Sequence, residues 1–410
     1  MKFIEQLAFA SVLGSSAIAS ANAFNINEHD AAATGRGGAT AATNTSPSSV
    51  VFNPGGLAVA DGTNIEIGGS LIFATGAYTP LDGGDKVETD TSPAIVPSAY
   101  VTSRINDLVA VGIGLHFPFG LAISWPDAHP QSDVIQDQSL RTYFITPSVG
   151  LNLDRSVPGL SIGAGIDVVP ATVELKQALI FGDTRGMAHL GGDAIGVGGR
   201  VGVMYRPPSV KGLKLGVMYR SAVTLDFEGK GDFDIDDPFR AQLPPDGDIS
   251  TSITLPQQVW GGVAYSPIDQ LEFEVDAVWI DWSKFKELRI ELPAGAETVS
   301  PQNYKDTVSF RLGGEYKLTP QKAAVRAGFV YDPTPMPRES LTARLPDIDR
   351  KVVTLGGSKY FGDFGAHLGL LWVMPGSRQA SDELYMPVYK AKYDVQAFVA
   401  SLSITGHLGH

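Results

Sequence analysis

The chain of 410 residues contains no cysteine, and only 18% of its residues are charged. Without disulfides, the fold must be stable through its own packing, unlike a small secreted scaffold. Soluble domains carry roughly 25% charged residues, so this chain has few charges for a surface that faces water. Its 44 acidic residues exceed its 31 Lys and Arg residues by 13, which excludes the basic surface that binds nucleic acid.

Long apolar runs are also lacking beyond the N-terminus. A membrane-spanning helix needs about 18 consecutive apolar residues, and GLLWVM at 369–374 is among the longest runs in the body of the chain. Hydrophobic residues nevertheless make up 43% of the sequence, which excludes a disordered chain. Glycine is abundant, with 46 residues, but lacks the regular period of collagen. The chain is therefore apolar in total but not in any one segment.

Residues 1–23 have the pattern of a secretory signal peptide. Lys2 and the amino terminus are positively charged, a mostly apolar stretch follows, and the A-N-A sequence at 21–23 is a small-residue cleavage site. A buried N-terminal helix is the alternative interpretation. We expect an exported protein whose mature chain begins at Phe24.

Apolar and polar residues alternate with a period of two in the body of the chain. In LEFEVDA at 271–277, the apolar residues occupy every second position and three acidic residues lie between them. The stretches 213–220, 307–317 and 323–332 show the same pattern. Successive side chains of a strand point to opposite faces, so each stretch predicts a strand with one apolar face.

A soluble antiparallel sandwich would also alternate, but two features favour a transmembrane barrel. Alternation recurs along the whole chain, and aromatic residues lie near many strand ends, as in the girdles of membrane barrels. We count fourteen strands, an even number, as in bacterial single-chain barrels. Because each strand crosses the membrane once, every second connection lies on the same side. If the first strand starts in the periplasm, the extracellular connections include all the long ones, 79–93, 126–140, 177–195, 233–250 and 377–390.

Residues 24–60 do not fit a strand, because Ala, Gly, Ser, Thr and Asn dominate and suit loops and short helical turns. A periplasmic tail is one interpretation. A plug inside the lumen is the other, since so wide a barrel must hold either water or filler. We therefore expect a signal peptide at 1–23, a plug at 24–60 and an all-β antiparallel barrel at 61–410.

Several blocks resemble the long-chain fatty-acid transporter (FadL-type) family of outer-membrane channels, which includes aromatic-hydrocarbon channels. SSVVFNPGGLA at 48–58 is similar to the family's N-terminal hatch, whose Asn-Pro-Ala motif is here Asn53, Pro54 and Gly55. The most specific block is RAGFVYDPTPMP…TARLPDIDR at 326–350. Further similar blocks are PFGLAISW, LSIGAGIDVV, LGVMYRSAVTLDFEGKGDF and WIDWSKFKEL.

The resemblance covers about residues 24–405 and implies passive uptake of hydrophobic molecules across the bacterial outer membrane. In the family, an extracellular groove captures the solute and a gap at a kinked third strand releases it into the membrane. Our third strand, 108–125, contains HFPFGL, in which proline removes a ladder donor and glycine favours a bend. A strand end entering a loop is the alternative. We expect the opening to be bordered by Phe117, Pro118, Phe119, Gly120 and Leu121.

The expected loop 177–195 is unusually apolar for an exposed segment, which indicates binding, although packing on a neighbouring loop is the alternative. A carboxylate head group would in addition need a cation that faces the lumen, although lumen charges more often pair with each other. The candidate substrate contacts are Leu179, Ile180, Phe181, Met187 and Leu190, with Phe239 on the loop 233–250, and the candidate cations are Arg220, Arg311, Arg326, Arg200 and Lys317.

Catalytic and metal-binding signatures are lacking. No H-E-x-x-H or G-x-S-x-G sequence occurs, so we expect no enzyme, no metal and no cofactor. The acidic segment 232–237 could hold Ca²⁺, but a solvated loop is the simpler interpretation.

Two other functions stay open at this point. A lipase-like barrel enzyme would need a Ser–His pair, for which His116 and Ser124 are the only near neighbours. A structural barrel or adhesin would lack a plug and a wall gap. We expect a monomer in contact with outer-membrane lipid, and we note that His410 stands where such barrels usually end in an aromatic residue.

Overall fold

A computed structural model of the chain describes residues 23–90, 92–236, 238–319, 322–381 and 390–409. The expected signal peptide, up to residue 22, and His410 lie outside the described residues. All strands belong to one antiparallel sheet, which closes on itself because β21 (Ala391–Leu408) pairs with β1 (Thr63–Pro80). No helix among the described residues is long and apolar enough to cross a membrane.

The closed barrel has fourteen strands, which confirms the predicted fold class and strand number. Some of these strands are interrupted and therefore consist of two segments. In chain order they are β1; β3 (Ala94–Arg104); β4 (Val109–His116) with β5 (Gly120–Ser124); β6 (Asp137–Thr142) with β7 (Phe144–Asn152); β8 (Leu160–Phe181); β9 (Thr184–Tyr205); β10 (Leu213–Arg220) with β11 (Val223–Asp234); β12 (Gly247–Leu255) with β13 (Gln258–Ile268); β14 (Leu271–Ile280) with β15 (Glu287–Glu291); β16 (Glu297–Pro301) with β17 (Thr307–Thr319); β18 (Ala323–Asp332); β19 (Arg350–Phe361); β20 (Phe364–Gln379); and β21.

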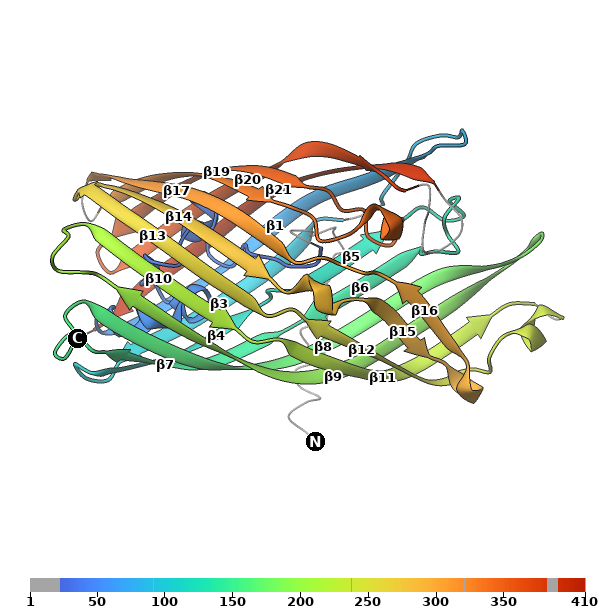
Figure 1. The fold of residues 1–410 in the computed structure, drawn as a ribbon, viewed down its shortest axis with the longest axis horizontal. Helices are drawn as coiled ribbons and strands as arrows, with labels where there is room; N and C mark the ends of the chain where they lie inside the picture. The colour runs from blue at the N-terminus through green and yellow to red at the C-terminus, as the bar shows by residue number, and fades with distance from the viewer. Residues whose placement is uncertain (1–22, 91, 237, 320–321, 382–389, 410) are drawn as a thin grey trace.

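Short turns gather at the end of the barrel that holds the C-terminus, and long hairpins extend from the other end (Figure 1). The hairpins contain β2 (Val87–Glu88), which pairs with β1, and single 3₁₀ turns. These turns are η3 (Phe239–Gln242), η4 (Trp282–Lys284), η5 (Pro293–Gly295) and η6 (Arg338–Ser340).

The prediction of a loop at 177–195 is wrong. Residues 177–195 are not a loop, because β8 and β9 stay paired from Leu160 opposite Tyr205 to Phe181 opposite Thr184. The chain reverses only at Gly182, whose φ of +60° glycine adopts without strain. The apolar residues from which we predicted a ligand-binding loop belong instead to the two strands, which continue beyond the membrane-facing part of the barrel. The loops at 126–140 and 233–250 are likewise shortened by β6, β11 and β12.

Alternation places apolar side chains on the outer face of the barrel, where Ile67 and Leu402 are each 63% exposed. Aromatic side chains on this face gather at two levels, as in the interfacial girdles of membrane barrels. The level near the short turns has Tyr265, Phe273, Tyr316, Phe361 and Phe364, and the level nearer the hairpins has Phe73, Tyr219, Phe310, Tyr331, Trp372 and Phe398.

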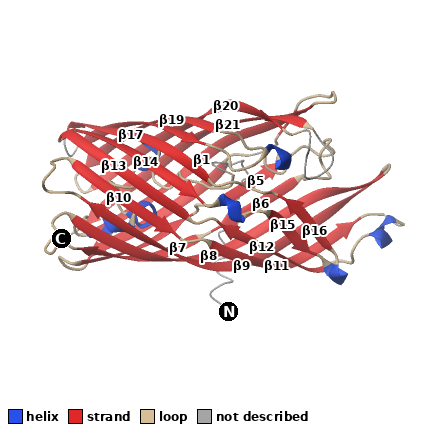
Figure 2. Cartoon of the chain, in the orientation of Figure 1, coloured by secondary structure: helices blue, strands red, loops and turns tan. Residues whose placement is uncertain are grey.

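Residues 23–58, here the N-terminal segment, lie within the barrel in its half near the short turns (Figures 1 and 2). The segment contains α1 (Ala31–Gly35), α2 (Ser49–Phe52) and the 3₁₀-helix η2 (Pro54–Ala58). None of its residues is exposed, and most are buried.

Glycines on the inner wall let this segment approach the strands closely. A Cβ at Gly163 would lie 2.1 Å from the Pro54 oxygen, and one at Gly216 would lie 2.0 Å from the Ala41 oxygen. Such distances are closer than real Cβ contacts allow, so a larger residue would displace the segment or the strand. Part of the glycine excess in the sequence is therefore explained by the contents of the lumen.

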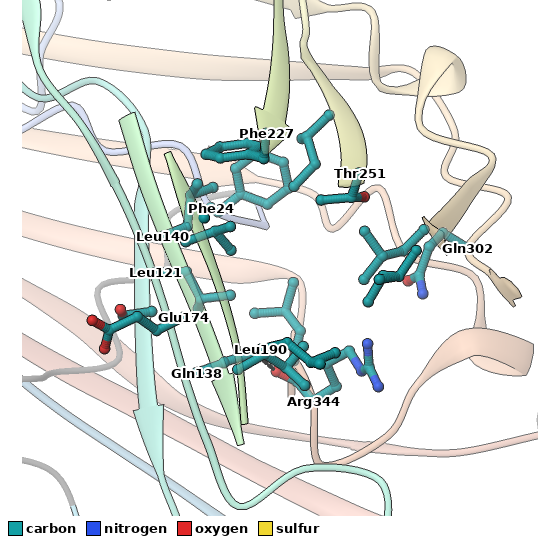
Figure 3. A pocket seen from close by; sticks show the side chains of 18 of the residues that line it. Phe24, Leu121, Gln138, Leu140, Glu174, Leu190, Phe227, Thr251, Gln302 and Arg344 are labelled. Carbon is teal, nitrogen blue, oxygen red and sulfur yellow. Dashed lines mark hydrogen bonds between the residues drawn. The ribbon is translucent and has the colours of Figure 1, made fainter. Parts of the chain in front are cut away.

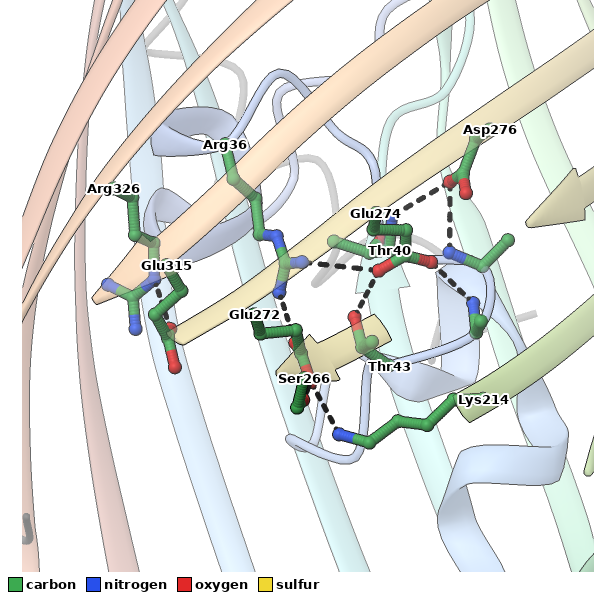
Figure 4. Close-up of polar contacts among 12 residues, drawn as sticks. Arg36, Thr40, Thr43, Lys214, Ser266, Glu272, Glu274, Asp276, Glu315 and Arg326 are labelled. Carbon is green, nitrogen blue, oxygen red and sulfur yellow. Dashed lines mark hydrogen bonds and ion pairs between the residues drawn. The ribbon is translucent and has the colours of Figure 1, made fainter. Parts of the chain in front are cut away.

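Acidic side chains on the inner face of β14 hold the segment through hydrogen bonds and ion pairs (Figure 4). Asp276 Oδ2 accepts from the backbone N–H groups of Thr40 and Ala41, at 2.8 and 3.0 Å. Arg36 donates to Glu272 at 3.1 Å and to Glu274 at 3.3 Å. The acidic face that the sequence shows at 271–277 is thus directed at the segment.

The expected hatch motif lies where the segment turns against the wall. Asn53 Oδ1 accepts from the Gly55 N–H at 3.0 Å and caps η2, whose first residue is Pro54. Asn53 Nδ2 donates to the Ala41 and Val203 oxygens, at 2.7 and 3.1 Å. One asparagine therefore fixes the local turn and also binds it to β9.

We predict that Gly163→Ala unseats the N-terminal segment, because the added methyl group meets the Pro54 carbonyl. Overpacking of this kind costs about 1–3 kcal/mol, which we expect as a lower free energy of unfolding together with a higher ion conductance in planar bilayers. Gly261→Ala is the matched control, since a Cβ there meets nothing within 4 Å. Equal conductance in the two variants would contradict the close contact.

Candidate functional site

An apolar cavity of about 110 Å³ lies in the half of the barrel near the long hairpins (Figure 3). For comparison, an engineered apolar cavity of about 150 Å³ stays dry and binds benzene. The cavity can therefore hold an apolar group of that order of size. Its apolar wall includes Leu140, Val173, Leu175, Leu190, Phe227 and Ile253.

The alternating sequence of each strand produces this apolar wall. On β8, Leu175 is buried while its neighbour Glu174 is exposed, and Figure 3 shows the Glu174 carboxylate pointing away from the cavity. On β11, Phe227 is buried while Glu228 is exposed. Near the short turns, the period of two gives the barrel an apolar outer face. Near the long hairpins, the same period places apolar side chains on the inner face.

Aromatic rings form one side of the cavity, where the N-terminal segment reaches it. Phe24 lines the cavity, and its ring centroid lies 4.8 Å from that of Trp282, 5.9 Å from that of Phe285 and 6.0 Å from that of Phe119. All four of these rings lie outside regular strands, and Phe24 is close to the start of the described chain. This aromatic cluster bounds the cavity on the side of the N-terminal segment.

The third barrel strand is interrupted beside this cluster. β4 pairs with β3 up to Leu115, whereas β5 pairs with β6. Residues 94–98 of β3 pair with β1 alone in the described chain. Between β4 and β5 the chain turns inward, so that Pro118 and Phe119 are buried.

The N-terminal segment pairs with the interrupted strand. Ile26 N–H donates to the Pro118 oxygen, and Gly120 N–H donates to the Phe24 oxygen, each at 2.9 Å. These two bonds form an isolated antiparallel bridge between Asn25 and Phe119. All five residues expected at the opening lie here: Phe117 packs on Tyr143 with centroids 5.1 Å apart, and Leu121 also lines the cavity.

The predicted capture residues are only partly brought together. Leu190 lines the cavity. Leu179 packs on the edge of the core, and Ile180 is 40% exposed near the tip of the hairpin. Phe181 contacts Phe239, with ring centroids 5.2 Å apart, and Met187 is half-buried opposite Asp234 of β11.

Most of the predicted cations are already paired, away from the cavity. Arg200 donates to Asp167 at 2.7 Å, and Arg326 donates to Glu315 at 2.7 Å. Arg311 donates to the Gly37 oxygen at 3.2 Å and lies over the Trp260 ring, and Lys317 is exposed. Arg220 differs, because its guanidinium lies 4.7 Å from the Phe119 centroid and makes no hydrogen bond or ion pair with a described residue.

The pair that an enzyme would need is not formed. His116 Nε2 contacts Arg200 at 3.1 Å, whereas Ser124 donates to Asp137. Within the described residues, no group of three or more His, Cys, Asp or Glu could hold a metal ion. The described part of the segment 232–237 begins as strand β11, and Asp237 lies outside the described residues.

An irregular segment that sequence reasoning did not single out, residues 336–345, lines the cavity, and the predicted loop region 126–140 packs against it. Trp125 Nε1 donates to the Ala343 oxygen at 3.0 Å, and Ala343 N–H donates to Gln131 Oε1 at 3.1 Å. Arg344, next in the chain, lines the cavity. The segment 336–345 has no periodicity, so the only signal for it was the family-like block at 326–350, whereas the connection 126–140 was predicted from the order of the strands.

Comparison with known proteins gives one consistent result. A family model described as outer membrane protein transport protein (OMPP1/FadL/TodX) matches residues 12–365. Outer membrane protein P1 of Haemophilus influenzae is 24% identical over 91% of this chain and 90% of its own length. The long-chain fatty acid transport protein of Salmonella typhi is 24% identical over 65% of this chain and 67% of its own length.

Solved structures show the same fold. A Pseudomonas aeruginosa FadL homologue superposes with a TM-score of 0.83 at 19% identity, covering 94% of this chain and 100% of its own. The Pseudomonas putida toluene transporter TodX superposes with a TM-score of 0.75 at 20% identity, covering 94% and 99%. At these identities the likeness establishes the barrel architecture.

The loop 126–140 contains a buried histidine, His129, which generates a pH prediction. Its Nε2–H donates to the Ile135 oxygen and its Nδ1 accepts from the Tyr78 hydroxyl, each at 2.8 Å. Burial lowers the pKa of His129 below its ordinary 6.5, although the Ile135 carbonyl, Asp133 and Asp137 oppose the shift. A depressed pKa stabilises the folded state fully above pH 6.5 and progressively less as the pH falls below it.

We therefore expect hydrogen-exchange protection of residues 125–136 to decrease as the pH is lowered through 6.5 in the wild type. His129→Gln should remove this dependence, because an amide can donate to Ile135 and accept from Tyr78 without titrating. If the variant keeps the same pH dependence, other groups are responsible.

Proposed function

The chain belongs to the outer membrane protein transport protein (OMPP1/FadL/TodX) family, and on this premise we propose that it captures hydrophobic compounds in its cavity and releases them sideways through its wall. Its location is the bacterial outer membrane, and its family consists of transport channels, not enzymes. The solute class, the capture site and the exit are the proposed parts. Fatty acids and aromatic hydrocarbons are the two candidate classes, from the names of its relatives.

The proposal rests on one observation: the cavity, the aromatic cluster and the interrupted strand are in contact with one another. The cavity is bounded by Phe24, the ring of Phe24 contacts Phe119, and Phe119 belongs to the interruption of the third strand. A solute in the cavity is thus separated from the interrupted wall by one aromatic cluster.

Solvation explains why the route would run sideways. Moving a CH₂ group from an apolar environment into water costs about 0.8 kcal/mol, so a solute in the apolar cavity meets this cost on entering the periplasm but not on moving into lipid. The lumen below is occupied by the N-terminal segment and its ionic contacts. Lateral exit therefore needs no energy source and avoids the polar half of the barrel.

The tip of the N-terminal segment is the part that must move. It is held by the two backbone bonds to Pro118 and Gly120 and by a hydrogen bond from Gln258 Nε2 to Asn25 Oδ1, at 3.0 Å. The body of the segment is anchored separately, by Arg36 and the acidic residues of β14. The tip can therefore leave the aromatic cluster while the lumen stays blocked to ions.

A structural barrel or adhesin was the other non-enzymatic alternative. Such a barrel has no use for a filled lumen or an interrupted strand, and the described chain has both. We therefore do not favour it.

A disulfide can test whether the tip must move, because the chain has no cysteine of its own. Asn25 and Phe119 form a bridge whose hydrogen bonds flank the pair, so their Cβ atoms are close enough for a disulfide. We expect Asn25→Cys with Phe119→Cys to abolish solute uptake by cells when oxidised and to restore it on reduction.

The matched control is Thr224→Cys with Thr254→Cys, whose Oγ1 atoms lie 3.3 Å apart on the exposed face of β11 and β12. This second disulfide should form without changing uptake. Full uptake by the oxidised Asn25–Phe119 pair would refute gating by the tip of the segment.

Filling the cavity tests capture. Leu190→Trp places a large ring in the cavity and should weaken binding of a fluorescent apolar probe to the purified barrel by about tenfold or more, because one lost 1.4 kcal/mol is tenfold in affinity. Ile195→Trp, on the same strand but 69% exposed on the outer face, should bind as the wild type does. If both variants bind the probe with the same affinity, the solute is not captured in this cavity.

A further inference from the structure

We propose that a second interruption of the barrel wall, between β12 and the connection from β14 to β15, is a sideways entrance through which apolar solutes pass from the membrane surface into the cavity. The inference rests on the channel function proposed above and adds a route of entry to it. This second interruption lies between the eighth and ninth barrel strands, whereas the proposed exit is at the third. Entry and exit therefore use different parts of the wall.

The strand β12 has a complete ladder on one side only. Its whole length pairs with β11, but on its other side only residues 250–251 pair, with residues 290–291 of β15. Nearer the short turns the ladder resumes between β13 and β14, where Gln258 lies opposite Ile280. Residues 252–256 therefore have no ladder partner on this side in the described chain.

Residues 282–288 lie across the interruption and bond to the strands on their other side. The Lys286 oxygen accepts from the N–H groups of Gln302 and Asn303, at 2.7 and 2.8 Å. Between 252–256 and 282–288, both fully described, no hydrogen bond is formed. At about 3.3 Å per residue, the unpaired stretch of β12 is about 17 Å long. The wall is thus interrupted over several residues.

Apolar side chains close the wall at this interruption. Ile253 and Leu255 are buried on the β12 edge, and Trp282 is buried on the other edge, where Phe285 and Leu288 pack against the same core cluster. A solute that parts these side chains exchanges one set of apolar contacts for another, whereas a solute that parts a ladder breaks backbone hydrogen bonds. This seam therefore opens to an apolar solute more easily than the paired wall beside it.

The interruption leads directly to the cavity. Ile253 from one edge and Phe285 and Leu288 from the other all line it. Their neighbours Ser252 and Glu287 are exposed, because alternate side chains of a strand point to opposite faces. One layer of side chains thus separates the cavity from the outside of the barrel.

The interruption begins at the membrane surface. Its lower corner is held by Gln257, which donates to Asp281 at 2.8 Å and accepts from the Tyr219 hydroxyl at 2.9 Å. Tyr219 belongs to the aromatic level nearer the hairpins, which marks the interface. Lys284 and Lys286 on the edge are exposed and form no ion pair with a described residue, which suits lysines among phosphate head groups. Unpaired backbone groups at this level can bond to water, as they could not in hydrocarbon.

The proposed exit lies deeper in the membrane than this entrance. Residues 94–98, beside the interrupted third strand, pair with residues 68–72 of β1. They are thus nearer the short turns than Phe73, which belongs to the same aromatic level as Tyr219. A solute that enters at the surface and leaves at the third strand is carried past the polar head groups into hydrocarbon. Throughout this route its apolar part stays out of water, so no energy source is needed.

A cross-link over the interruption tests the entrance, because the chain has no cysteine of its own. Ser252→Cys with Glu287→Cys places one thiol on each edge, at exposed positions that a short bifunctional thiol reagent can join. Ser250→Cys with Glu291→Cys is the matched control, because the ladder of the same two strands is intact there and the two native side chains bond at 2.9 Å. Both variants without the reagent show that the barrel folds.

The probe is a phospholipid whose head group carries a phenyl diazirine on a short tether, so that the reactive ring cannot leave the membrane surface. After irradiation of the full-length barrel in vesicles, we expect labels on Ile253, Phe285 and Leu288. Cross-linking of the Ser252–Glu287 pair should abolish these labels and slow the uptake of a free apolar solute without changing its equilibrium affinity. The cross-linked control should keep both the labels and the uptake rate.

Three results would overturn the entrance while the wild type still takes up free solute. The labels could persist after cross-linking of the Ser252–Glu287 pair, they could disappear instead when the Asn25–Phe119 disulfide is oxidised, or the anchored probe could label none of the three residues in the wild type. A wild type that takes up no free solute would overturn the channel function itself.

Discussion

The structure depends on one constraint: backbone hydrogen bonds cannot be left unpaired in the hydrocarbon of a membrane, so a barrel wall opens only where another segment replaces the missing partner. Here the ladder fails between β4 and β5, and the N-terminal segment supplies the replacement through Ile26 and Phe24. The same few residues close the wall and bound the cavity. The wall, the lumen and the cavity are therefore connected through two backbone hydrogen bonds and a cluster of rings.

The strength of the contacts differs along the N-terminal segment. Its body is held by buried carboxylates of β14 that accept from consecutive backbone N–H groups and from Arg36. Breaking such a buried ionic contact by removing one partner costs several kcal/mol, whereas a neutral backbone hydrogen bond contributes about 1 kcal/mol net. In the proposed mechanism the tip is therefore the part that a bound apolar solute displaces, while the body stays in place.

Much of the fold followed from a period of two in the sequence, because each strand must face lipid on one side and the lumen on the other. That rule located the strands and their number, whereas the interruption at Pro118 was predicted from its proline and glycine together with the family resemblance. It failed at 177–195, where strands continue beyond the membrane and look like an apolar loop. It also missed Arg344 and Phe24, since irregular segments have no period. The alternation along the strands predicted that Arg220, Arg311 and Arg326 face the lumen. It could not show that Arg311 and Arg326 already have hydrogen-bond partners, because those partners are distant in sequence.

The path of the solute is the central claim, and photolabelling measures it directly. A fatty acid with a photoreactive group in its chain is added to outer membranes, irradiated and located on the protein by peptide mass spectrometry. The account predicts labels on cavity residues such as Leu190 and Phe227 and on both sides of the interruption, at 94–98 and 117–121. Labels along the lower lumen, at residues 36–44 and on β14, would show that the solute passes through the barrel toward the periplasm and would contradict lateral exit.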